Sequence, residues 1–448
     1  MTQHRIWVLC IVLGGFAPVR QPAAAQFIFP QKHWQQYTDP AQAGWSVKKL
    51  AQAGQYADSI HLAATLIIYK GAVLASWGDI ERKYLCHSMR KSFLSALYGL
   101  AIHEGVINKQ ATLEQLGIDD RVHPLTVAEK QATVQDLLQA RSGIYLPAAY
   151  EGNPQKPPRG SHPPGSFWFY NNWDFNALGT ILEQKTGRRF FADLQQRLAV
   201  PLQMEDVDSL DVFYKYEPER SQYPAYTFKM STRDLARFGL LYLAGGKWNA
   251  QPLLPASWIQ ESIQPYSVND EGEGYGYLWW IDQTLFKERG MYSAAGMSGH
   301  HIFIFPKDSL LVVVRADTYT DTFVDLKSEY QLLTKILGAK TAPTAAQPAL
   351  QRLPALTSPP MPNPSLSVDQ RRYVGRFQFA DEWMHVLPGK KGLLMDTQYM
   401  GKFHLLPCTE SVFLLKDQQT YISFLFDKAG KAVKLIYHER SKLSVKNE

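Results

Sequence analysis

Cysteine is scarce in this 448-residue chain, which contains only three. Cys10 lies in an apolar N-terminal run, and Cys86 and Cys408 stand far apart in the sequence. This scarcity excludes a disulfide framework and a cysteine-built zinc site. We expect no metal ion and no cofactor, and the sequence shows no internal repeat.

A strong excess of charge of either sign is also missing. The chain has 47 Lys and Arg against 41 Asp and Glu, a formal net charge of +6, and loss of Arg5 and Arg20 with the N-terminal segment described next lowers it to +4. This balance predicts no nucleic-acid partner. No later stretch reaches the roughly 18 to 20 apolar residues of a membrane helix, so we expect no integral membrane segment in the mature chain.

The first 25 residues have the three parts of a secretory signal. Arg5 provides the basic start, Ile6 to Phe16 form a short apolar run, and Ala23 to Ala25 precede Gln26. Such a run is too short to span a membrane comfortably. We expect residues 1–25 to be removed and the protein to be periplasmic or secreted.

Composition divides the remaining chain into two parts. Residues 339–364 are rich in Pro, Ala, Thr and Ser without a hydrophobic period, which predicts a semi-extended linker between a body at 26–338 and a segment at 365–448. In that segment, apolar runs at 421–426 and 433–437 flank the turn Asp-Lys-Ala-Gly, a hairpin pattern. We expect a small all-β, barrel-like accessory domain there, without a catalytic cluster.

The larger body has strand patterns at both ends and helical patterns in the middle. Residues 63–69 with 72–77, and 301–305 with 310–315, predict two hairpins. The helical stretches between them are 88–103, 133–140 and 233–244. This order predicts an α/β (α+β) fold, in which one antiparallel sheet from both chain ends is flanked by helices and a helical subdomain is inserted.

Ser88 and Lys91 form the first candidate for chemistry. A serine hydroxyl becomes a nucleophile when a neighbouring base removes its proton, and a spacing of three residues places both side chains on one helical face. The stretch that follows is apolar on most sides, so burial is expected to disfavour the ammonium form of Lys91. Ser46 and Lys49 have the same spacing, but Ser46 fits a helix N-cap better.

Tyr170 and Asn172 form the second candidate. They follow Pro163-Pro164-Gly165, a turn that favours a loop at a cleft. A phenol near a lysine can act as general base or proton shuttle, and an asparagine can both donate and accept hydrogen bonds, here to Lys91 and to a substrate amide. Taken alone, these residues also fit a tight turn in an aromatic surface loop.

Residues 294–302 read Ala-Ala-Gly-Met-Ser-Gly-His-His-Ile. They nearly match the nucleophile elbow of α/β-hydrolases, which would make Ser298 the nucleophile, but His300 stands where that elbow requires glycine. His300 and His301 alternate faces on a strand and do not easily chelate one metal. His87 is interpreted as structural. Four tryptophans fit either an acyl pocket or the core, with Trp173 the best pocket candidate: Trp168, Trp173, Trp279 and Trp280.

The ordered set resembles the penicillin-recognising serine hydrolases. A Ser-x-x-Lys helix, a Tyr-x-Asn loop about 80 residues later and a Gly-rich strand are similar to class C β-lactamases, D-Ala-D-Ala peptidases, and the related esterases and 6-aminohexanoate-dimer hydrolases. Residues 133–143, 230–239 and 275–280 add to the similarity, which spreads over most of 40–338. The resemblance implies a β-lactamase-like three-layer fold, and the C-terminal segment resembles the accessory domains of some such hydrolases.

The resemblance also implies roles for single residues. Ser88 would be the nucleophile, Lys91 and Tyr170 the base pair, and Asn172 a positioning group. The backbone N–H groups of Ser88 and Met297 would form the oxyanion hole. The residues implied to bind substrate are Trp173 as a pocket wall, and Gly296, Ser298 and Gly299 from the third motif.

The third motif lacks the lysine that β-lactamases carry, and is similar to the aminohexanoate-dimer hydrolase and esterase branch. The usual anchor for the carboxylate of a β-lactam or a peptidoglycan stem is therefore missing. We expect a serine hydrolase that cleaves amide or ester bonds of a small molecule or peptide through an acyl-enzyme. The alternative is a non-catalytic protein of the same fold that binds peptidoglycan or a partner.

Overall fold

The computed structural model describes most of the chain, and the predicted signal lies outside the described residues. Within them, no helix is long and apolar enough to cross a membrane. The described ranges are 27–151, 155–208, 211–318, 322–354, 362–379, 382–390, 392–397, 401–415 and 420–439.

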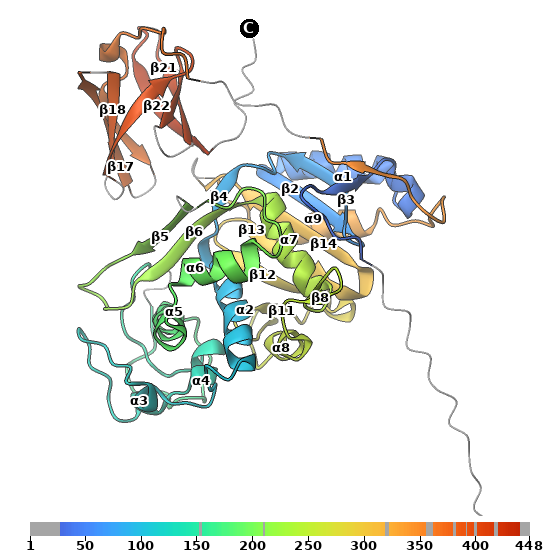
Figure 1. Ribbon diagram of the computed structural model, residues 1–448, viewed down its shortest axis with the longest axis vertical. Helices are drawn as coiled ribbons and strands as arrows, with labels where there is room; N and C mark the ends of the chain where they lie inside the picture. The colour runs from blue at the N-terminus through green and yellow to red at the C-terminus, as the bar shows by residue number, and fades with distance from the viewer. Residues whose placement is uncertain are drawn as a thin grey trace, which may run out of the picture.

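A ten-stranded sheet forms the centre of the larger body, and both ends of that body contribute to it (Figure 1). In spatial order its strands are β15 (Leu350–Arg352), β1 (Gln35–Tyr37), β3 (Ala72–Gly78), β2 (Leu62–Tyr69), β14 (Leu310–Ala316), β13 (His300–Phe305), β12 (Tyr292–Gly296), β11 (Trp280–Asp282), β10 (Glu273–Tyr275) and β9 (Ser267–Val268). All neighbours pair antiparallel except β1 and β3, which are parallel. The two predicted hairpins are confirmed as β2–β3 and β13–β14.

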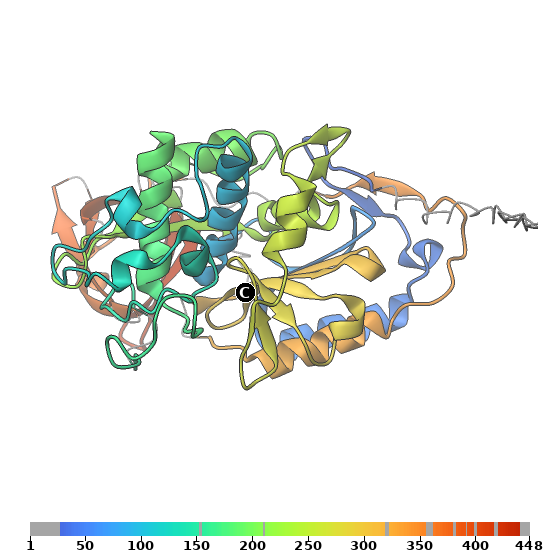
Figure 2. The same ribbon diagram turned by 90° about the horizontal axis from the view of Figure 1, so that it is seen from below.

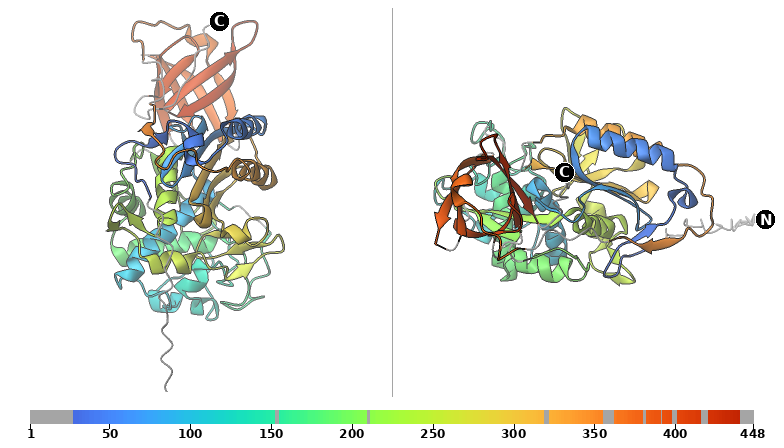
Figure 3. Two further views of the ribbon diagram at one scale, coloured as in Figure 1. Left: turned by 90° about the vertical axis from the view of Figure 1, so that its right-hand side faces the viewer. Right: turned by 90° about the horizontal axis from the view of Figure 1, so that it is seen from above.

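Helices cover both faces of this sheet. The helices α1 (Val47–Ser59) and α9 (Leu326–Leu337) lie side by side on one face, and α7 (Thr232–Leu243) packs on the other (Figures 2 and 3). The central strands are therefore buried on both sides, which explains the apolar runs Ile302 to Phe305 in β13 and Leu310 to Val314 in β14. Gly239 lets α7 approach closely, because a Cβ there would lie 2.6 Å from the Leu311 side chain.

The helical subdomain surrounds α2 (Arg90–His103), which is buried over nearly its whole length. The predicted helix at 88–103 is confirmed, but its first turn is a 3-10 turn, η2 (His87–Met89). A short sheet of β4 (Lys83–Leu85), β6 (Ala225–Ser231) and β5 (Val212–Lys215) borders this subdomain. The remaining elements are α3 (Leu113–Leu116), α4 (Val134–Leu138), α5 (Asn172–Thr186), α6 (Phe190–Leu194), β7 (Lys247–Trp248), β8 (Gln251–Pro252) and α8 (Ala256–Ser262).

The C-terminal part is an antiparallel, nearly closed seven-stranded sheet with its own apolar core. Figure 3 shows it curled beside the larger body. The predicted hairpin is confirmed as its last strand pair. The strands are β16 (Gly375–Phe379), β17 (Glu382–Gly389), β18 (Gly392–Thr397), β19 (Gly401–Pro407), β20 (Val412–Leu415), β21 (Thr420–Phe426) and β22 (Ala432–Glu439).

The predicted linker contains one regular element. Strand β15 lies within 339–364 and pairs with β1 at the edge of the main sheet. A three-residue strand is too short to show an alternating pattern in the sequence, so composition alone did not reveal it. Part of the linker, 355–361, lies outside the described residues.

Candidate active site

The fold brings Ser88, Lys91 and Tyr170 together. The Lys91 Nζ atom lies 2.8 Å from Ser88 Oγ and 2.5 Å from Tyr170 Oη. The phenol comes from a segment 79 residues further along the chain, just before α5. Ser88 and Tyr170 are half-buried, whereas Lys91 is only 2% exposed. A hydroxyl within reach of solvent thus meets a buried amine and a phenol.

A strained turn presents Ser88. Strand β4 ends at Leu85, and His87 then adopts a φ of 45°, which is uncommon for a residue with a side chain. The Met89 N–H donates to the Cys86 carbonyl and closes the turn. Ser88 therefore stands at the entry of α2, which is buried from its first residue, Arg90.

Electrostatics around Lys91 favour its neutral form. Burial, followed by the neighbouring Arg90 guanidinium, holds the pKa of Lys91 well below its ordinary value, and Glu151 opposes the shift. Burial raises the pKa of Tyr170 to about 12, although a hydrogen bond with Ser88 and the charge of Arg90 work against it. These two shifts favour a neutral amine beside a protonated phenol.

Asn172 has a different contact from the one expected. Its Nδ2 donates to the Tyr150 carbonyl at 2.6 Å, and no hydrogen bond with Lys91 is present among the described residues. Its Oδ1 is buried and accepts no hydrogen bond from the described residues, so its acceptor capacity is unused. The expectation that Asn172 holds Lys91 is corrected, because this residue starts α5 and faces Tyr150.

Tyr150 connects the first two motifs and was missed in the sequence. Its φ is 56°, its N–H donates to Glu217, and its hydroxyl lies 3.0 Å from His87 Nδ1. Asn172 holds its carbonyl. No spacing signal marks this residue, because each of its contacts comes from a different part of the chain.

A buried polar chain continues from His87 to Arg315. The His87 Nε2 and His300 Nε2 atoms lie 3.1 and 3.4 Å from the Thr318 hydroxyl, and Arg315 Nε donates to His300 Nδ1 at 2.8 Å. Burial, then Arg315, lowers the pKa of His87 to about 3 and the pKa of His300 well below its usual range. Both imidazoles are neutral near neutral pH, and the Arg315 N–H makes His300 Nδ1 an acceptor, so the His300 proton lies on Nε2, toward Thr318.

The third motif borders the Ser88 turn. Strand β12 ends at Gly296 and packs against η2, where a Cβ on Gly296 would lie 3.0 Å from the Cys86 carbonyl oxygen. Met297 is exposed, and within the described residues its N–H donates to no backbone carbonyl. Ser298 and Gly299 form the hairpin loop with φ values of 63° and 98°. The hairpin thus brings a backbone N–H to the edge of the nucleophile turn.

The two histidines after this loop face opposite sides of the sheet. His301 contacts Glu329 of α9, and His300 accepts a hydrogen bond from Arg315 of β14. In the described part of the chain no group of three or more metal-binding side chains could hold an ion. Both cysteines there, Cys86 and Cys408, are buried and free.

Two of the four tryptophans lie near the phenol. Trp280 stacks on Tyr170 with ring centroids 5.7 Å apart, and Trp168 contacts Trp280; both are half-buried. Trp173 is completely buried, and its Nε1 donates to Asp120 at 2.9 Å, so it cannot contact a substrate. The expectation for Trp173 is corrected: on α5 it points into the helical subdomain, away from the Ser88 side.

The second Ser-x-x-Lys pair has no catalytic geometry. The Ser46 Oγ accepts the Lys49 backbone N–H at 3.3 Å and caps α1, which confirms the N-cap interpretation. The Lys49 Nζ donates instead to the Gly338 carbonyl. Spacing alone therefore does not separate the two pairs, whereas their tertiary surroundings do.

The chain is similar in sequence and in fold to known proteins. Residues 47–334 match the family model described as Beta-lactamase. An uncharacterized protein of Alkalihalophilus pseudofirmus is 22% identical over 252 residues, 50% of this chain and 71% of the relative. A solved structure of a candidate 6-aminohexanoate-dimer hydrolase from Bacillus anthracis has a TM-score of 0.50 at 18% identity, over 70% of this chain and 87% of that chain. A D-stereospecific amidohydrolase from Streptomyces sp. has a TM-score of 0.47 at 18% identity, over 66% and 99%.

Proposed function

Because the chain belongs to the beta-lactamase family, whose members are generally hydrolases, we propose that it is a serine hydrolase that cleaves amide or ester bonds through an acyl-enzyme on Ser88. The observation that carries this proposal is the position of the Lys91 Nζ atom, which lies between the hydroxyls of Ser88 and Tyr170. A capping serine with a surface lysine would need neither the burial of that amine nor the phenol beside it.

In the proposed acylation, the neutral Lys91 amine accepts the Ser88 proton as Oγ bonds to the substrate carbonyl carbon. The carbonyl π electrons move to oxygen, and the N–H groups of Ser88 and Met297 stabilise that oxyanion. When the tetrahedral intermediate collapses, the bond to the leaving group breaks. The leaving nitrogen or oxygen takes a proton from the Tyr170 hydroxyl, which Lys91 reprotonates.

Deacylation runs through the same groups with water in place of the serine. Water gives a proton to Lys91, its oxygen attacks the acyl carbon, and Ser88 leaves with that proton. The Asn172 side chain is held by the hydrogen bond that its Nδ2 donates to the Tyr150 carbonyl, and its Oδ1 atom would accept an N–H of an amide substrate. Trp168 and Trp280 would pack against the acyl group.

The missing third-motif lysine supports a substrate without a carboxylate at that position. A relative named for 6-aminohexanoate-dimer hydrolysis and one named as a D-stereospecific amidohydrolase make linear amides suitable first substrates. We also propose that the enzyme acts outside the cytoplasm, since residues 1–25 have the composition of an export signal.

Steady-state hydrolysis of p-nitrophenyl butyrate and D-alanine p-nitroanilide tests this function. Ser88→Ala should lower kcat at least about 10³-fold and Lys91→Ala about 10² to 10⁴-fold. Ser46→Ala is the matched control, because it removes a serine with the same spacing to a lysine; its activity should persist. Equal turnover in wild type and Ser88→Ala would reject the proposal, and tight penicillin or peptide binding without turnover would favour the non-catalytic alternative.

A further inference from the structure

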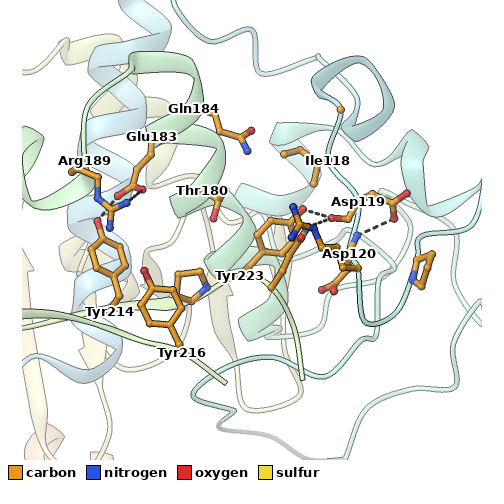
Figure 4. Close-up of a pocket in the computed structure, with 15 residues that line it drawn as sticks. Ile118, Asp119, Asp120, Thr180, Glu183, Gln184, Arg189, Tyr214, Tyr216 and Tyr223 are labelled. Carbon is orange, nitrogen blue, oxygen red and sulfur yellow. Dashed lines mark hydrogen bonds and ion pairs between the residues drawn. The ribbon is translucent and has the colours of Figure 1, made fainter. Parts of the chain in front are cut away.

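A groove with a volume of about 720 Å³ lies in the helical subdomain, and Ser88, Lys91 and Tyr170 do not line it (Figure 4). Loop residues 117–124, the second half of α5 and the segment after β5 line it. This volume lies in the range of small-molecule sites. The α5 residues that line it begin at Thr180, about 12 Å along the helix from Asn172 at 1.5 Å per residue, so a molecule bound here occupies a site separate from the catalytic one.

The floor of this groove is rigid. Tyr223 is 3% exposed, and its hydroxyl donates to the Asp119 carbonyl at 2.5 Å. The buried Asp120 carboxylate accepts hydrogen bonds from Ser221 and from Trp173, at 2.5 and 2.9 Å. These contacts fix the shape of the groove before any ligand arrives, which lowers the entropic cost of binding.

The charges of the groove are mostly paired within the protein. Arg189 lies 3.5 Å from the Glu183 carboxylate and 4.3 Å from the centre of the Tyr214 ring, and the Tyr214 hydroxyl also donates to Glu183. Asp119 pairs with Lys130 at 2.6 Å. Arg121 remains as an exposed cation at the rim, where a single charge contributes little. The lining therefore offers no cluster of one sign to a charged ligand.

Neutral groups in the groove keep hydrogen-bonding capacity. Figure 4 shows Thr180, Gln184 and Tyr216 around the space between the Arg189 side and the Ile118 side. Within the described residues, the Thr180 hydroxyl and the Gln184 amide, which both line the groove, form no hydrogen bond. The Tyr216 side chain is 62% exposed, which is high for an aromatic ring. The groove thus combines an exposed ring with groups that both donate and accept.

We propose that this groove binds a neutral oligosaccharide chain, as an attachment site separate from Ser88. A sugar ring has an apolar face of C–H groups that packs on an aromatic ring, and hydroxyls around its edge that each donate and accept. Tyr216 supplies the ring, and Thr180 and Gln184 supply matching polar groups. The absence of a one-signed charge cluster favours a neutral chain over an acidic one.

Calorimetry on the full chain tests the proposal, with cellohexaose, chitohexaose and maltohexaose as neutral probes and an oligogalacturonate as the acidic probe. At least one neutral probe should bind, and Tyr216→Ala should weaken it about tenfold, the effect of about 1.4 kcal/mol. Thr180→Val is a second, nearly isosteric variant that should also weaken binding. Phe213→Ala is the matched control, because Phe213 is 41% exposed on the neighbouring strand but does not line the groove.

Catalysis separates this proposal from the hydrolase proposal. Tyr216→Ala should hydrolyse p-nitrophenyl butyrate like wild type, and Ser88→Ala should bind the oligosaccharide like wild type. Three results would overturn the groove assignment: no binding of any neutral probe, binding that Tyr216→Ala and Thr180→Val leave unchanged, or binding of the oligogalacturonate alone.

Discussion

Two buried basic side chains stand side by side at the candidate active site. Arg90 and Lys91 are 1% and 2% exposed, and the Arg90 guanidinium lies over the rings of Tyr150 and Tyr226 at 5.4 and 5.2 Å. An arginine keeps its proton under all ordinary conditions. Burial and then this fixed charge therefore both lower the pKa of Lys91, which favours the neutral amine that the proposed base requires.

The pH dependence of hydrolysis follows from these directions. Lys91 must be neutral to act, and its pKa is lowered, so activity should be present above that pKa and lost as pH falls through it. Tyr170 stays protonated until its pKa of about 12. We expect kcat/KM for p-nitrophenyl butyrate to show one rising limb, with a midpoint well below the ordinary pKa of lysine, and then a plateau through pH 9. Activity that rises only near pH 10 would contradict this account.

Arg90 should help to set the pH at which kcat/KM rises. Arg90→Gln removes a charge that, after burial, helps to lower the pKa of Lys91, so the limb should move to higher pH. The pH profiles of kcat/KM for wild type and Arg90→Gln provide the measurement. A limb that does not move in Arg90→Gln would show that burial alone controls the lysine.

Single residues differ in how well the sequence predicts them. The contact of Lys91 with Ser88 follows from helical spacing, since both lie in one turn. The phenol of Tyr170 could be placed near them only through a family resemblance, because 79 residues separate the two segments. Tyr150, Thr318 and Arg315 could not be found from the sequence, because each provides one partner in a hydrogen-bond network that exists only in the folded protein.

Among the elements, the first turn of α5 contains both Asn172 of the candidate site and an unusual buried acid, Asp174. Asp174 is completely buried, and it accepts hydrogen bonds from the Ser142 hydroxyl at 2.6 Å and the Asn171 amide at 2.8 Å. Burial raises its pKa to about 8, although these hydrogen bonds and Lys156 oppose the shift. The start of α5 is therefore most stable when this acid is protonated.

Replacement of that acid should change how stability depends on pH. A raised pKa in the folded state stabilises the protein at acidic pH, and this contribution is lost as pH rises from about 4 through 8. Asp174→Asn keeps the shape and removes the titration, so relative to wild type it should gain about 1 kcal/mol or more between pH 5 and pH 9. Urea unfolding at pH 5, 7 and 9 measures the difference. A constant difference between the two proteins would contradict the assignment.

The sequence predicted the regular elements whose hydrophobic pattern extends over many residues. The two hairpins of the main sheet have strands of six to eight residues and clear turns, and they appear as predicted. Strand β15 has three residues and depends on β1 for its existence. The direction of Trp173 was misjudged because the rotation of α5 about its axis is set by its packing on α2 and α4 rather than by its own sequence.

At the scale of the whole molecule, the C-terminal sheet has a core of its own. Tyr373, Phe413 and Phe424 meet edge to face with ring centroids 5.1 to 5.5 Å apart. This core is a separate cluster from those of the larger body. The two bodies should therefore fold independently.

Truncation tests that independence. A chain that ends at residue 354 keeps β15 and should retain ester hydrolysis within about twofold, because no candidate catalytic residue lies beyond it. A chain that ends at residue 345 also loses the pairing of β15 with β1, and its free energy of unfolding should fall by about 1 to 3 kcal/mol. Urea unfolding and kcat measure both. An inactive or unfolded 354-residue chain would show that the C-terminal sheet supports the larger body.

The identity of the nucleophile is tested most directly by covalent labelling. The protein is incubated with a fluorophosphonate, and intact mass and peptide mapping locate the adduct. One adduct should form on the peptide that contains Ser88, disappear in Ser88→Ala, and persist in Ser298→Ala, which removes the serine of the near-match to a nucleophile elbow. Equal labelling of wild type and Ser88→Ala, or an adduct on Ser298, would contradict the proposed mechanism.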